Sequence, residues 1–269
     1  NKDCLEAGKH VLSEKPLANT EGECLDLIHT AQARDLVLMT AYCMRFHPLT
    51  VHMKQLIDER TYGDVFQLSM WTEQFTRYHD GHWALTAANL GGGQFFSHGC
   101  HYIDLLLWFL GRPLKGTHMG TNYGTPWMER EGTSHVTIEF DSRALGYHAG
   151  TWGARGSRLR YSFHAHCTEG MIEAQFKAGK LFVHTDQGEK LLLDTETGKH
   201  VQGELAHFVD CVRNGRKPLT DGPGSLQGLR VIWRLYEAEQ KGVIADLGGL
   251  GLDEPWDIEG LASLPTSSP

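Results

Sequence analysis

The order of secondary-structure signals at the start of the chain constrains its fold most strongly. An apolar run at residues 9–13 predicts a strand, and Pro16 ends it because proline cannot donate a ladder hydrogen bond. A capping box at Thr20 then opens a helical period of apolar residues. A second apolar run at 37–41 predicts another strand, and Pro48 opens another helix. Strand, helix, strand and helix in this order are typical of a parallel, doubly wound α/β sheet.

A different pattern dominates the chain from Gly63 onward. Short runs alternate between apolar and polar residues with a period of two, which is typical of half-buried strands separated by tight turns. These runs predict strands at residues 64–75, 116–123, 134–140, 144–151, 158–166, 171–176, 180–184 and 190–193. A continuous apolar run predicts one buried helix at 95–110, and helical periods predict two late helices at 204–213 and 224–241. We therefore predict an α+β domain with a large, mostly antiparallel open sheet after the parallel α/β part.

Charge and cysteine usage exclude several classes of protein. The chain has 33 acidic and 25 basic residues, a net charge of −8, and no Lys/Arg block, which argues against nucleic-acid binding. No apolar run approaches the roughly 18 residues of a membrane span. The six cysteines are scattered without a C-x-x-C pair, and the opening residues lack the apolar core of a signal peptide. We therefore expect a cytoplasmic protein with reduced thiols.

The tripeptide Glu14-Lys15-Pro16 follows directly after the first predicted strand. In open α/β sheets, ligands bind outside the carboxyl ends of the parallel strands. Lys15 is therefore a candidate for a binding crevice, although a lysine taken by itself is more often a solvated surface charge.

A glycine triplet at 91–93 introduces the second segment with chemical potential. Helical spacing places Ser97, His101 and Asp104 along one face of the predicted helix at 95–110. A histidine in such a position can accept a hydroxyl proton near neutral pH. The alternative is a core histidine whose ring bonds a backbone carbonyl.

A third segment, from Glu204 to Arg230, has a structural interpretation. We expect Phe208 to pack, and the turn at Asp221-Gly222 to cap the last helix.

The abundance of histidine, 16 residues in all, raises the question of a metal site. Two clusters are candidates, one formed by His98, Cys100 and His101, and the other by His164, His166 and Cys167. Neither cluster supplies four ligands locally, and no carboxylate stands at ligand spacing. We therefore expect no metal.

Together these segments resemble the glucose-fructose oxidoreductase/inositol dehydrogenase (Gfo/Idh/MocA) family. The resemblance rests on A-G-K-H-V-L-S-E-K-P-L-A (7–18), Y-C-M-R-F-H-P (42–48), the glycine-triplet helix with G-x-H-x-x-D (99–104), and E-L-A-H-F-V-D-C-V-R-N-G-R-K-P-L-T-D-G (204–222). These motifs occur in the family's order up to about Gly242, and the E-K-P motif is highly specific in this context.

The resemblance implies an NAD- or NADP-dependent oxidoreductase that transfers a hydride between nicotinamide and a sugar, cyclitol or related polyol. It implies that Lys15, before a proline with an often cis bond, positions the substrate oxygen, and that His101 is the catalytic acid and base. Further site residues carried over are Ser97, His98, Asp104 and Tyr42 for substrate, and Glu14, Lys15, Pro16 and Arg45 for cofactor. Ser97 departs from the family, which commonly has Asp there; serine cannot stabilise an imidazolium by charge.

The resemblance also implies a division of the chain. Residues 1–48 correspond to the end of a dinucleotide-binding Rossmann domain, 49–242 to a substrate and oligomerisation domain, and 243–269 to an irregular tail. Because the family's G-x-G-x-x-G turn does not occur before Asn1, we expect a fragment that is itself inactive, has impaired NAD(P) binding, and forms homo-oligomers through the second-domain sheet. Two alternatives are an NAD-dependent glycosidase-like enzyme, which Ser97-His98-Gly99 resembles, and a non-catalytic binding module.

Overall fold

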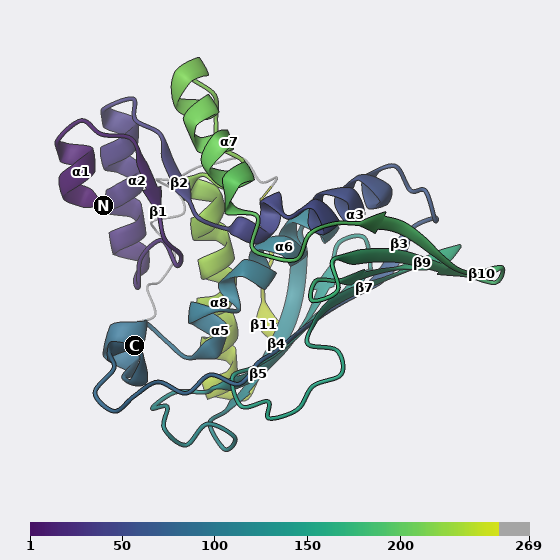
Figure 1. Cartoon of the computed structure of the whole chain (residues 1–269). Coiled ribbons are helices and arrows are strands. Elements are labelled where there is room, and N and C mark those ends of the chain that lie inside the picture. Colours follow the sequence, from purple (N-terminus) through teal and green to yellow (C-terminus); the bar gives the residue numbers. More distant parts are fainter. Residues whose placement is uncertain (253–269) are drawn as a thin grey trace.

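A computed structural model describes residues 1–252 of the chain (Figure 1). The predicted tail lies outside the described residues from 253 onward. Its start forms a short strand, β11 (Ala245–Asp246), which pairs with the edge of the large sheet. The described residues contain no helix long and apolar enough to cross a membrane.

The beginning of the chain folds as the predicted parallel unit. Strand β1 (Val11–Ser13) pairs in parallel with β2 (Leu38–Thr40), and helix α2 (Glu21–Ala33) connects them, with the short α1 (Lys2–Glu6) packed beside it. The capping box is confirmed, because the Thr20 side chain accepts from the Glu23 backbone and the Glu23 carboxylate accepts from the Thr20 backbone.

The second part is built on a nine-stranded sheet in the order β10-β9-β8-β7-β3-β6-β5-β4-β11. All neighbours are antiparallel except β3 and β6, so the prediction of a large, mostly antiparallel sheet is confirmed. Its other strands are β3 (Val65–Glu73), β4 (Pro113–Thr121), β5 (Thr133–Phe140), β6 (Leu145–Thr151), β7 (Tyr161–Cys167), β8 (Gly170–Gln175), β9 (Lys180–Thr185) and β10 (Gly188–Asp194).

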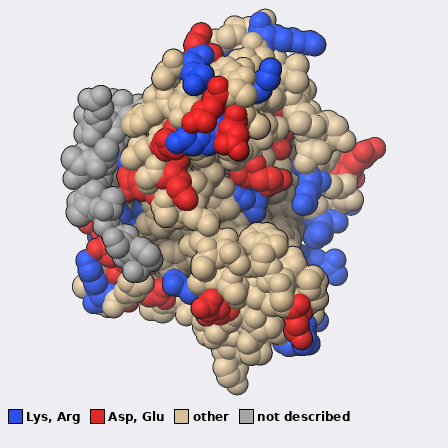
Figure 2. Space-filling model, turned by 90° about the vertical axis from the view of Figure 1, so that its left-hand side faces the viewer, with Lys and Arg blue, Asp and Glu red and all other residues tan. Residues whose placement is uncertain are grey.

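Helices cover one face of this sheet (Figure 1). They are α3 (Pro48–Asp58), α5 (Gln94–Ser97), α6 (Cys100–Leu110) and α8 (Gly222–Lys241). Helix α7 (Val201–Asn214) instead packs on the 3-10 turn η1 (Cys43–Phe46), and the short η2 (Trp83–Leu85) and α4 (Ala87–Leu90) precede the glycine triplet. On the side of the molecule shown in Figure 2, acidic and basic side chains are interspersed, and neither sign forms a continuous patch.

Helix α8 joins the two parts of the molecule. It packs against α2 and β2 on one side and against β4 on the other. The Arg230 Nε donates to the Glu21 carboxylate at 2.8 Å, and the Thr40 amide donates to the Thr220 carbonyl at 2.8 Å. One continuous hydrophobic core, from Leu5 to Leu250, results from this packing. The division at residues 48 and 242 stays a prediction.

The predicted helix at 95–110 is not continuous, which corrects one expectation. Helix α5 ends at Ser97 and α6 begins at Cys100. The amides of His98 and Gly99 both donate to the Gln94 carbonyl, at 2.8 and 2.9 Å, so one extra residue is inserted into the helical ladder. The expectation that Ser97, His101 and Asp104 share one face of a single rigid helix is therefore wrong.

Candidate active site

The Lys15 side chain links the first part of the molecule to the break between α5 and α6. The Lys15-Pro16 peptide bond after β1 is cis, as the resemblance implied. The Lys15 Nζ donates a 2.7 Å hydrogen bond to the backbone carbonyl of Ser97. A residue of the E-K-P motif and a residue of the glycine-triplet segment, 82 positions apart, are thus held together.

His101 lies in the first turn of α6, beside this contact. Its ring is 7% exposed and stands edge-on to the ring of Tyr42, with centroids 5.5 Å apart. Tyr42 follows β2, so the ends of both parallel strands contribute to the site. The His101 Nδ1 and the Tyr42 hydroxyl are buried and receive no hydrogen bond from residues 1–252. Neither atom has its hydrogen-bonding capacity satisfied within these residues.

The surroundings of His101 favour its neutral form. Burial lowers its pKa well below the usual value, and the charges of Lys15, His98 and Lys199 lower it further. The ring is consequently uncharged near pH 7, which is the form that can accept a proton.

His98 lies in the break itself and is held from two directions. Its Nδ1 lies 3.3 Å from the Gln94 Nε2, and its Nε2 lies 3.5 Å from the Tyr102 hydroxyl and 3.4 Å from the Tyr161 hydroxyl. Burial, together with Lys15 and Lys199, lowers the pKa of His98 to about 3. His98 thus has the contacts of a positioned core histidine that ties the helix break to strand β7.

Arg45 and Asp104 contact each other. The Arg45 Nε and Nη2 donate to the two Asp104 carboxylate oxygens at 2.6 and 2.9 Å, and both side chains are at most 3% exposed. The Arg45 guanidinium also lies over the Trp108 ring, 4.4 Å from its centroid. Such a bidentate pair is a structural arrangement. A role for either residue at a ligand stays a prediction that this geometry does not favour.

The other predicted residues take varied positions. Ser97 contributes its carbonyl to Lys15, Pro16 is half-buried, and Glu14 is exposed beside Lys15. Their contacts with substrate or cofactor stay predictions.

The segment between β10 and α7 approaches the site, which the sequence did not reveal. The charge of Lys199 acts on His98, His101 and Cys43, and that of Glu204 acts on Cys43. Lys199 stands in a polar loop with no pattern around it, so nothing could have identified it. Glu204 stands in a motif that we interpreted as structural.

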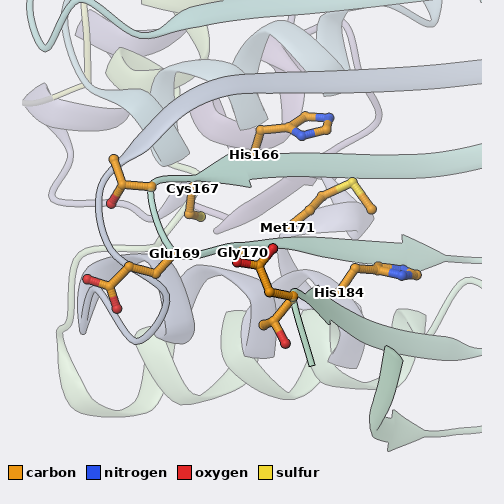
Figure 3. A pocket seen from close by; sticks show the side chains of 9 residues that line it. His166, Cys167, Glu169, Gly170, Met171 and His184 are labelled. Atoms are coloured by element: carbon orange, nitrogen blue, oxygen red, sulfur yellow. The ribbon is translucent and has the colours of Figure 1, made fainter. Parts of the chain in front are cut away.

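The histidines near the end of the sheet form no metal centre among residues 1–252. His164 and His184 face Glu173 instead, at Nε2–Oε distances of 3.6 and 2.8 Å. His166 and His184 line a surface pocket of about 360 Å³ between the β7–β8 and β9–β10 turns (Figure 3). None of the predicted site residues lines this pocket.

Comparison with known proteins agrees with this geometry. Residues 1–42 match the sequence profile described as oxidoreductase family, NAD-binding Rossmann fold, and residues 50–173 match that of the GFO/IDH/MocA C-terminal domain. The chain belongs to the Gfo/Idh/MocA family. Both ends of the site lie in the matched regions, since Lys15 and Tyr42 fall in the first and His101 in the second.

Several relatives within the Gfo/Idh/MocA family are sugar or polyol dehydrogenases. D-xylose 1-dehydrogenase (NADP(+)) 2 of Haloferax volcanii is 25% identical over 249 residues, which are 89% of this chain and 74% of that protein. The scyllo-inositol 2-dehydrogenase (NAD(+)) of Bacillus subtilis is 26% identical over 80% of this chain and 64% of its own length. An uncharacterized oxidoreductase of Schizosaccharomyces pombe is 33% identical over 40% of this chain but only 29% of its own length.

Two solved oxidoreductase structures share the fold of this chain. Levoglucosan dehydrogenase in complex with NADH and levoglucosan superimposes with a TM-score of 0.82 and 20% identity, over 92% of this chain and 76% of that one. Aldose-aldose oxidoreductase from Caulobacter crescentus, complexed with glycerol, has a TM-score of 0.81 and 22% identity, over 91% and 74% of the two chains.

Proposed function

We propose that this chain carries the catalytic residues of an NAD(P)-dependent dehydrogenase or reductase that acts on a CH-OH group of a sugar, cyclitol or related polyol. The observation that supports this most directly is the hydrogen bond from Lys15 to the Ser97 carbonyl, which holds an ammonium group beside the neutral, buried His101. The named activities of the relatives support the same substrate class.

The residues present fit the nicotinamide end of such a cofactor. The unpartnered Tyr42 hydroxyl and His101 Nδ1 offer hydrogen bonds in a buried place at the carboxyl ends of β1 and β2. The 269 residues contain no G-x-G-x-x-G turn to hold a pyrophosphate. When bound, a nicotinamide supplies or removes a hydride at its ring C4.

The side chains of this site have complementary roles in the proposed reaction. In oxidation, the Lys15 ammonium holds and polarises the substrate oxygen, and His101 accepts the hydroxyl proton as the carbon loses its hydride. In reduction, His101 returns that proton to the oxygen. The Ser97 carbonyl keeps the Lys15 ammonium in place throughout. It accepts a hydrogen bond from one of the three N–H groups of that ammonium.

Replacement of the two central residues tests the proposal. We expect Lys15→Met and His101→Asn, each made in a version of the protein extended by a glycine-rich dinucleotide-binding segment, to lower kcat on D-xylose or scyllo-inositol by about a thousandfold, the usual contribution of a positioned acid–base group. Lys9→Met, an exposed lysine two residues before β1, is the matched control and should keep full activity. The reaction is followed by nicotinamide absorbance, and circular dichroism checks the fold. Full turnover in a folded Lys15→Met variant would contradict the proposal.

Cofactor affinity is a separate part of the proposal. Without a glycine-rich turn among these residues, we expect the 269-residue chain to bind NAD and NADP weakly. Isothermal titration measures this directly, and micromolar affinity for either nucleotide would overturn the expectation.

Since all six cysteines are unpaired, a reducing compartment such as the cytoplasm is the location we propose.

The open face of the large sheet is the surface through which we propose homo-oligomers form. No described helix covers this face, and it presents large apolar side chains: Met119 is 74% exposed, Phe66 52% and Leu145 45%. Exposed apolar area of this kind commonly marks a protein interface. Met119→Glu combined with Leu145→Glu should convert the oligomer to a monomer in sedimentation experiments. A monomeric unsubstituted chain would contradict this proposal.

A further inference from the structure

Glu204, in the first turn of α7, is a buried acid that the proposed reaction does not use. The residue is 4% exposed, and no described residue donates a hydrogen bond to its Oε1. A buried carboxyl oxygen without a partner is unfavourable. Its position here therefore points to a partner that lies outside the described residues.

The start of α7 is held against the elements that carry the site. The His200 ring packs edge-on against the His47 ring at 4.6 Å, and the His207 ring lies 5.3 Å from the Phe46 ring. Phe46 ends η1, the turn that begins after Tyr42, whose ring contacts His101. Glu204 lies four residues after His200 and three before His207, and this spacing places it on the same side of α7 as the two rings that contact η1 and its C-cap.

The Cys43 thiol, at the start of η1, is influenced by charges from α7 and from the end of β1. Burial raises the pKa of the Cys43 thiol, the charges of Glu204 and Glu14 raise it further, and those of Lys199 and Lys15 lower it. The charged groups around this thiol are thus Lys15 and Glu14 after β1, Lys199 before α7, and Glu204 itself. His47, His200 and His207 are titratable groups where α7 meets η1 and α3.

We propose that Glu204 is a specificity residue of this site, whose carboxyl binds a hydroxyl group of the polyol substrate other than the one that reacts. The inference rests on the proposed function. A carboxylic acid can donate to such a hydroxyl or accept from it, and a carboxylate can only accept. Burial, with a smaller effect of the Glu14 charge, raises the pKa of Glu204 to about 7, so both forms are present at neutral pH.

Two substitutions separate binding from packing. Glu204→Gln keeps a hydrogen-bonding group of the same size at every pH, whereas Glu204→Leu removes it. With D-xylose, scyllo-inositol and levoglucosan as probes, we expect Glu204→Leu to raise KM of the best probe about tenfold, the effect of one lost hydrogen bond, with a smaller change in kcat. Glu204→Gln should keep KM within about threefold and abolish its pH dependence around neutral pH. Asp210→Asn, on the same helix, is the control and should change neither quantity.

Outcomes for the two proposals are distinguishable. If folded Glu204→Leu has the same KM as the unsubstituted protein for each probe, the role of Glu204 is overturned and the proposed reaction is left intact. Saturation-transfer NMR with the same polyols needs no turnover. A protein that shows no activity even when saturated with NAD or NADP, and that loses polyol binding only in Glu204→Leu, would support this inference and contradict the proposed function. If Glu204→Leu does not fold, Glu14→Gln provides the second test, because it should lower the pH midpoint of KM; an unchanged midpoint would contradict the proposal.

Discussion

The spacing of Asp104 from His101 is compatible with two roles, a contact with substrate or a structural ion pair. Its place three residues after His101 suggested a substrate contact, yet its carboxylate is fully used by Arg45. The pair connects η1, which carries Arg45, to α6, which carries Asp104. It therefore holds Tyr42 and His101 in register through their own backbone elements.

This pair gives a prediction at the scale of single residues. Asp104→Asn should lower the free energy of unfolding by about 3–5 kcal/mol, because it leaves the Arg45 guanidinium buried without its counter-charge. The double substitution Asp104→Leu and Arg45→Met should lower the free energy of unfolding by less than the sum of the two single substitutions. Urea unfolding measures both. Asp141→Asn, which weakens the exposed pair with Arg112, is the matched control and should cost about 1 kcal/mol or less. An Asp104→Asn protein as stable as the control would contradict the prediction.

At the scale of elements, the break between α5 and α6 decides the geometry of the site. It turns the Ser97 carbonyl toward Lys15 and places His98 where two tyrosines reach it. Gly99 permits the break, since a Cβ there would lie 2.3 Å from the Phe95 carbonyl oxygen. The atom that a Cβ at position 99 would meet belongs to the backbone, and the backbone cannot move aside as the end of a flexible side chain can.

Alanine substitutions at two glycines, one in the break and one inside α2, test this account of the break. Gly99→Ala should destabilise the fold by about 1–3 kcal/mol through overpacking. Gly22→Ala, in the first turn of α2 where nothing lies within 4 Å of a new Cβ, should instead stabilise it by up to about 1 kcal/mol. Thermal unfolding of the two variants is the measurement. Similar shifts in both variants would show that helix propensity, and not the close approach, governs position 99.

Several histidines in the interior of the molecule are neutral, and the stability of the protein should therefore depend on pH. Burial lowers the pKa of His98 to about 3 and that of His47 to about 4, and lowers those of His101 and His148 well below the usual value. Below their unfolded pKa of 6.5, the unfolded chain binds protons that the folded chain does not. Stability is therefore full above pH 6.5 and is lost as the pH falls toward 4.

We expect each such histidine to add up to about 1.4 kcal/mol per pH unit to this loss. His148→Gln keeps a polar group near Thr72. This substitution should reduce the loss of unfolding free energy on acidification by the contribution of one histidine. Glu204 acts in the opposite sense, because its raised pKa adds stability below pH 4.5 that is lost as the pH rises through about 7. Urea unfolding at pH 7 and pH 5 measures the net effect. An equal stability at the two values would contradict the account.

The sequence by itself determined the elements of this protein and their order. Capping at Thr20, proline at position 48 and the alternation along β3 to β10 are local signals, because they depend on neighbours a few residues away. The motifs likewise predict that Lys15 and His101 belong to one site. Only the tertiary structure decided the break at His98-Gly99, the pairing of Arg45 with Asp104, and the approach of Lys199 and Glu204. These features arise from contacts between residues far apart in the chain, whose free energies no local pattern contains.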